Sequence, residues 1–140
     1  MGRADALIAL RQALSAVPDL ELLAEPAELQ RHSRDAFEYS PVLTPRLERC
    51  RAELVVRPHT VEAVERLASV CTEHHVPLTL RGSGTGNYGQ CVPLQGGVVM
   101  LTTALCQIRS LDAATGVVTV EPGCVMRDLC LLYTFRAHET

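Results

Sequence analysis

The stretch RGSGTGNYGQ, Arg81–Gln90, carries glycines at the spacing G-x-G-x-x-G. That spacing is typical of a nicotinamide dinucleotide-binding turn only when its last glycine opens a helix, because the helix N-terminus binds the pyrophosphate. Beyond Gly89 the chain reads QCVPLQGGVVML, where Pro93 and two further glycines leave no room for a helix. The acidic residue expected about twenty positions on is replaced by Arg109, and no G-K-[ST] follows. The sequence therefore argues against a nicotinamide site and against a Walker loop.

A strand, a helix and a second strand precede this loop. Leu54–Val56 is rich in residues that favour strands, and Pro58 ends it. Thr60 is placed to cap a helix whose apolar residues, between Val61 and Cys71, share one face. Val76–Leu80 predicts the second strand. The short joints predict a β-α-β unit with parallel strands, so the glycine loop should lie at their carboxyl edge, where open α/β sheets bind ligands.

The segment after the loop predicts three further strands. The first covers Val98–Leu101, and the other two cover Gln107–Leu111 and Val117–Val120. The turn DAATG, Asp112–Gly116, joins the last two strands, and Gly116 can adopt positive φ there. These features predict an antiparallel hairpin.

Helices are expected before the β-α-β unit. Ala4–Val17 has leucines at three- and four-residue spacing, and Pro18 ends this amphipathic pattern. A short helix is expected from Pro26 to Gln30, and the interval His32–Arg51 predicts a loop that wraps the surface. The fold class expected from the whole chain is α+β.

Composition excludes several function classes. The net charge of −3, the pI near 5.9 and the 4% aromatic content argue against nucleic acid as a partner. No uninterrupted apolar segment suits a signal peptide or a membrane span, so we expect a cytoplasmic protein. The six cysteines include no C-x-x-C pair, which favours reduced thiols and no metal site.

Glycine is concentrated in the loop: six of the nine glycines fall between Gly82 and Gly97. If Gly82, Gly84 and Gly86 adopt left-handed conformations, their N–H groups can converge on an anion. Charge-assisted hydrogen bonds contribute about 1.5–3 kcal/mol each, so four or five could anchor a pyrophosphate without a helix dipole. A flexible surface loop is the remaining alternative.

Three motifs together resemble one known family. They are R-G-x-G-T-G-x-x-G in the loop, x-x-R-P at the end of the first strand and V-E-P-G at residues 120–123; SRDAFEYSP, Ser33–Pro41, adds to them. Over about Ser33 to Leu129 the chain resembles the first half of the FAD-binding PCMH-type domain of the vanillyl-alcohol oxidase / p-cresol methylhydroxylase family. It is similar above all to the FAD-linked oxidases that include glycolate oxidase and D-lactate dehydrogenase subunits.

The resemblance implies FAD as cofactor and assigns residues to it. The implied cofactor-binding residues are Arg81, Gly82, Ser83, Gly84, Thr85, Gly86 and Asn87 around the pyrophosphate, Tyr88 and Gly89 closing the loop toward the flavin, and Gly123 in a turn that approaches the cofactor. Some branches attach flavin through a histidine at the fifth position of the loop. Thr85 stands there, so the resemblance implies non-covalent FAD.

The resemblance also implies parts that these residues do not supply. The family oxidises 2-hydroxy acids or similar alcohols, and its catalytic residues come from a later cap domain and the C-terminal region. We therefore assign no catalytic residue, and expect residues 1–50 to be a lead-in and residues 51–140 a partial FAD-binding domain. The likeness stops near Leu129, which suggests an N-terminal fragment, inactive alone. The alternative is a non-catalytic nucleotide-binding or interaction module that pairs with a partner chain.

Overall fold

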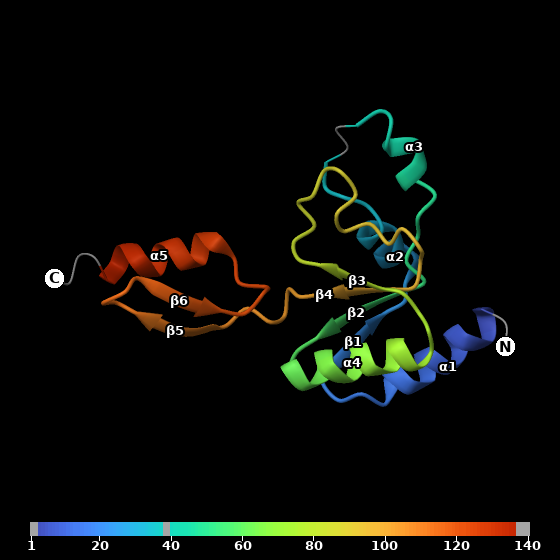
Figure 1. The fold of residues 1–140 in the computed structure, drawn as a ribbon, viewed down its shortest axis with the longest axis horizontal. Helices are drawn as coiled ribbons and strands as arrows, with labels where there is room; N and C mark the ends of the chain where they lie inside the picture. The colour runs from blue at the N-terminus through green and yellow to red at the C-terminus, as the bar shows by residue number, and fades with distance from the viewer. Residues whose placement is uncertain (1–2, 38–39, 137–140) are drawn as a thin grey trace.

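A four-stranded sheet with helices on both faces forms the main body of the protein (Figure 1). The structure, a computed structural model, describes residues 3–37 and 40–136. The strand order is β1-β2-β4-β3, and a separate two-stranded sheet follows. In chain order the elements are α1 (Arg3–Ser15), β1 (Leu20–Leu23), α2 (Pro26–His32), α3 (Thr44–Leu47), β2 (Leu54–Pro58), α4 (Val61–Glu73), β3 (Leu78–Arg81), β4 (Val98–Leu101), β5 (Ile108–Asp112), β6 (Val117–Val120) and α5 (Met126–Arg136).

The central strands β2 and β4 are buried on both faces of the sheet. Successive residues of a strand point to opposite faces, so Val56 packs in the cluster with α1 and α4, whereas Val55 packs with Leu29 of α2. Figure 1 shows α1 and α4 on one side of the sheet and α2 on the other. Burial on both faces explains why these strands read as continuous apolar runs in the sequence.

The predicted β-α-β unit is confirmed, with one addition. Helix α4 begins where expected, and the Thr60 side chain accepts a hydrogen bond from the Ala63 N–H at 3.2 Å. Strands β2 and β3 are both parallel to β4, which lies between them. The strand after the glycine loop therefore returns to the middle of the sheet, and β3 lies at its edge.

The hairpin unit, residues 108–136, lies to one side of the main body (Figure 1). Strands β5 and β6 pair antiparallel as predicted, and Gly116 has a φ of +69°. The Asp112 carboxylate accepts hydrogen bonds from the Ala114 and Thr115 N–H groups at 2.9 and 3.3 Å, which closes the turn. Helix α5 follows the hairpin.

Two elements differ from the sequence prediction. Leu20–Leu23 forms β1, an antiparallel edge strand paired with β2, although its sequence LELL shows no sustained alternation. The interval His32–Arg51, predicted to be a loop, contains α3. Pro45 lies in the first turn of that helix, where no hydrogen bond is lost through its missing N–H. No helix in the described part of the chain is long and apolar enough to cross a membrane.

Candidate functional site

The glycine loop connects two neighbouring strands at the carboxyl edge of the parallel strands. It leaves β3 after Arg81 and returns to β4 at Val98. The Thr102 N–H donates to the Arg81 carbonyl at 2.9 Å, so the strand pairing continues up to the first residue of the loop. The position expected from the sequence is confirmed.

The backbone of the loop differs from the expected conformation at two of three glycines. Gly84 has a φ of +72°, whereas Gly82 and Gly86 do not adopt positive φ. The prediction that all three glycines adopt left-handed conformations is therefore wrong. Gly89, at +89°, is the second left-handed residue of the motif.

Five consecutive backbone amides at the start of the loop have no acceptor among the residues that the structure describes. Within residues 3–37 and 40–136, no group accepts from the N–H groups of residues 82–86. The next three amides are engaged by side chains: Gln90 Oε1 accepts from Asn87 and Tyr88 at 3.2 and 2.9 Å, and Asp35 Oδ2 accepts from Gly89 at 2.7 Å. The amides of residues 82–86 thus have no acceptor among the described residues, although Gly84 itself is buried, whereas those of residues 87–89 are held by the chain itself.

Arg81 places a positive charge beneath the loop. The residue is 6% exposed, and its guanidinium occupies the space that a Cβ at Gly84 would need. Its Nη1 is buried with no partner among the described residues. Burial lowers the pKa of Arg81. The charges of Cys91 and Asp35 favour the protonated guanidinium and offset part of this lowering. An arginine stays protonated despite such a shift, so this cation attracts an anion bound to the loop.

An open cleft of about 630 Å³ adjoins the start of the loop. No carboxylate is among the described residues that line it, but two lining side chains are bonded to glutamates: Arg57 to Glu21 at 2.9 Å and His32 to Glu28 at 3.1 Å. Burial and then the charge of Arg81 lower the pKa of His32, and Arg57 is paired with Glu21, so the cationic character of the cleft comes mainly from Arg31 and Arg81. The lining residues are Arg31, His32, Arg57, Arg81, Gly82, Ser83, Leu101 and Thr103.

The cleft includes three residues that were not predicted to belong to the site: Arg31, His32 and Arg57. Arg57 belongs to the x-x-R-P motif at the end of β2, so its position at a strand end was a usable signal. Arg31 and His32 end α2, and nothing in the local sequence indicates that this helix end faces the loop. Only the folded arrangement brings these side chains together.

Gly123 lies in a turn that packs on backbone atoms. Its N–H donates to the Leu105 carbonyl at 2.7 Å, and a Cβ at this position would overlap the Thr102 carbonyl. The Thr102 hydroxyl is in turn 3.9 Å from a Cβ built at Gly82. Gly123 therefore packs against the residues that follow β4, next to the end of β3 from which the loop leaves, and its lack of a side chain permits this approach.

A comparison with known families decides the identity of the domain. Residues 52–132 match a family model described as an FAD binding domain. The chain belongs to this FAD-binding domain family.

Curated relatives of this FAD-binding chain include oxidase subunits and dehydrogenases. The glycolate oxidase subunit GlcD of Escherichia coli K12 is 30% identical over 97% of this chain and 25% of its own length. The corresponding subunit of Bacillus subtilis is 34% identical over 65% of this chain and 19% of its own length. A probable mitochondrial D-lactate dehydrogenase of Danio rerio is 38% identical over 59% of this chain and 17% of its own. The chain thus spans a quarter or less of these relatives.

Solved structures share the fold. p-Cresol methylhydroxylase with substrate bound has a TM-score of 0.74 at 21% identity, over 93% of this chain and 25% of that chain. An alkyldihydroxyacetonephosphate synthase has a TM-score of 0.71 at 19% identity, over 86% of this chain and 23% of that chain. The predicted α+β fold and the predicted likeness to PCMH-type FAD-linked oxidases are confirmed.

The described residues suit the pyrophosphate of FAD. One loop holds five amides without an acceptor and a left-handed glycine, and it lies over a buried arginine whose Nη1 has no partner, all as judged from the described residues; the arginine-lined cleft adjoins it. Backbone N–H groups and guanidinium groups are the donors that bind phosphate oxygens most strongly.

Proposed function

We propose that the chain binds FAD non-covalently, with the pyrophosphate on the amides of residues 82–86. The observation that carries this proposal is the run of five amides at the carboxyl edge of the parallel strands for which the described residues supply no acceptor. Arg81 contributes charge from below the loop. Tyr88, which is 59% exposed, is available to cover the flavin side of the loop, and Gly123 supports the strand end from behind.

Non-covalent binding follows from the residue at the fifth position of the motif. Thr85 offers a hydroxyl and an amide, neither of which forms the bond that a histidyl flavin needs. When bound, FAD supplies a two-electron acceptor. The chain contributes binding and orientation of the cofactor, and we assign no catalytic residue to it.

The substrate class is proposed from the relatives. Glycolate and D-lactate are named in their descriptions, so we propose that the complete protein oxidises a small 2-hydroxy acid. Within this chain, residues 51–140 would carry the FAD-binding part and residues 1–50 the lead-in. The 140 residues alone should not turn over either acid, and a cytoplasmic location stays a prediction.

One observation favours the alternative of an interaction module. Apolar side chains of the hairpin unit are exposed, among them Val117, Val125, Met126 and Leu131. Such a surface suits contact with a partner chain. In that reading, the glycine loop would bind a nucleotide without any redox role.

Isothermal titration calorimetry with FAD, ADP and FMN tests the proposal. A site for a pyrophosphate should bind FAD and ADP competitively and should bind FMN more weakly, because FMN carries one phosphate. We expect saturable FAD binding, weaker than that of a complete relative. The absence of FAD binding at millimolar concentration would contradict the proposed function.

A further inference from the structure

The lead-in segment contacts the glycine loop at two points. Asp35 Oδ2 accepts from the Gly89 N–H at 2.7 Å, and the Ala36 N–H donates to the Gly84 carbonyl at 3.0 Å. Gly84 and Gly89 are also the two left-handed residues of the motif. Two adjacent residues of the lead-in thus bond to the two left-handed positions of the motif.

Asp35 also explains the glycine at position 86. A Cβ there would lie 3.1 Å from Asp35 Oδ1 and 2.8 Å from Gln90 Oε1. Gly86 does not have positive φ, so the requirement for glycine comes from these two side chains and not from the backbone angle. The Gln90 and Asp35 side chains need this space, because together they accept hydrogen bonds from the three successive amides of residues 87–89.

Asp35 is itself held in place by the core. Two residues earlier, Ser33 is fully buried; its hydroxyl donates to the Leu29 carbonyl and accepts from the Ala52 N–H at 2.8 Å. These bonds fix the lead-in to α2 and to the residues that precede β2. Asp35 is therefore held in a fixed position relative to the sheet that carries the loop.

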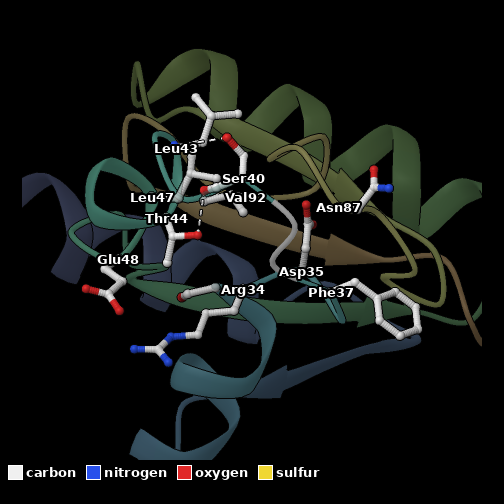
Figure 2. A pocket seen from close by; sticks show the side chains of 11 residues that line it. Arg34, Asp35, Phe37, Ser40, Leu43, Thr44, Leu47, Glu48, Asn87 and Val92 are labelled. Atoms are coloured by element: carbon white, nitrogen blue, oxygen red, sulfur yellow. Dashed lines mark hydrogen bonds between the residues drawn. The ribbon is translucent and has the colours of Figure 1, made fainter.

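The Asp35 carboxylate lines a small hollow between the lead-in and the loop. Figure 2 shows Asp35 and Asn87 among the side chains that line it. Asp35 Oδ1 is buried and has no partner among the described residues, and the pKa of Arg81, lowered by burial, is lowered less because of the charges of Cys91 and Asp35. A carboxylate beside an anion site repels the negative charge of the ligand. Ligand charge therefore gives no reason for Asp35 at this place, whereas its hydrogen bond from the Gly89 N–H does.

We propose that Asp35 is a positioning residue for the cofactor loop. Its carboxylate fixes the Gly84–Gly89 turn, and the amides of residues 82–86 consequently keep their free orientation toward the ligand. Asp35 does this without touching FAD. The inference rests on the proposed function, because it assigns the loop to FAD.

Amide hydrogen exchange without FAD tests the anchor independently of cofactor binding. Asp35→Ala should speed exchange at the Gly89 amide at least tenfold, and Asp35→Asn should preserve its protection because the amide oxygen still accepts. Gln90→Ala should release the Asn87 and Tyr88 amides instead. Glu48→Ala removes a carboxylate from the same hollow that makes no bond to the loop, and should change none of these rates.

FAD titration of the same variants tests the positioning role. The Kd should rise at least tenfold in Asp35→Ala, and should stay within about threefold of the unmodified chain in Asp35→Asn and Glu48→Ala. Unchanged Gly89 exchange in Asp35→Ala would overturn the anchor, and unchanged FAD affinity despite faster exchange would overturn the positioning role. An unmodified chain that binds no FAD would refute the proposed function and with it the assignment to FAD, while the exchange rates still decide whether Asp35 fixes the loop.

Discussion

Replacing Gly84 with alanine tests the structure of the glycine loop most directly. Gly84 has a φ of +72°, and a Cβ there would overlap the Arg81 guanidinium, with Nε only 2.7 Å away. The variant must therefore either shift the loop backbone or displace the buried arginine. Both changes disturb the free amides on which the proposed binding depends.

The size of the effect follows from two terms. A left-handed conformation costs a non-glycine residue about 1–2 kcal/mol, and one lost charge-assisted hydrogen bond costs about 1.5–3 kcal/mol. Since about 1.4 kcal/mol corresponds to a factor of ten in affinity, the loss of one such bond should raise the Kd for FAD by roughly 10- to 150-fold. Gly84→Val should have a larger effect because its branched Cβ needs more space.

Calorimetric titration with FAD measures this change, and Gly116→Ala provides a matched control. Gly116 has a nearly identical φ of +69°, but a Cβ there would meet nothing within 4 Å. This control should lose a similar amount of backbone stability while FAD affinity stays unchanged. Unchanged affinity in both Gly84 variants would refute the role assigned to the loop.

Three further predictions concern attachment, activity and pH. Acid precipitation of the FAD complex should release the yellow flavin into the supernatant, because Thr85 forms no histidyl bond; colour that stays in the pellet would identify a covalent link through another residue. With FAD added, residues 1–140 should not reduce dichlorophenolindophenol with glycolate or D-lactate, because the chain offers no assigned acid or base; dye reduction above a no-protein control would disprove this. Hydrogen bonds from the Thr115 hydroxyl, then from the Ala114 and Thr115 amides, lower the pKa of Asp112, so the turn should be stable above the ordinary aspartate pKa of about 3.9 and open as pH falls through the lower folded value. NMR of the Ala114 and Thr115 amides would follow this opening, and a transition that persists unchanged in Asp112→Asn would exclude Asp112 as its cause.

Elements governed by local sequence could be predicted from the residues alone. The Thr60 cap and the apolar face of α4 identify a helix, and the DAATG turn identifies a hairpin. Strand β1 could not be predicted, because its four half-buried residues are defined by pairing with β2 and not by their own pattern. The central place of β4 is likewise a property of the assembled sheet.

The candidate site, too, could be predicted only in part from the local sequence. Glycine spacing locates the loop, but it does not show which amides are free, since that depends on Gln90 and Asp35. Asp35 is 54 residues away from Gly89 along the chain, and contacts of such sequence separation have no local signal. Glu38 and Tyr39 of the quoted lead-in lie outside the described residues.

The place of β4 between β2 and β3 has a consequence for how the protein is made. As the chain leaves the ribosome, β2 and β3 emerge without the strand that joins them, so the parallel part of the sheet can close only after residues 98–101 follow. By then residues 82–97 must already span from the edge of the sheet to its centre. The entropic cost of closing that segment is therefore part of the free energy of forming the core. Lengthening the cofactor loop should therefore slow folding of the whole sheet, and not only weaken the site.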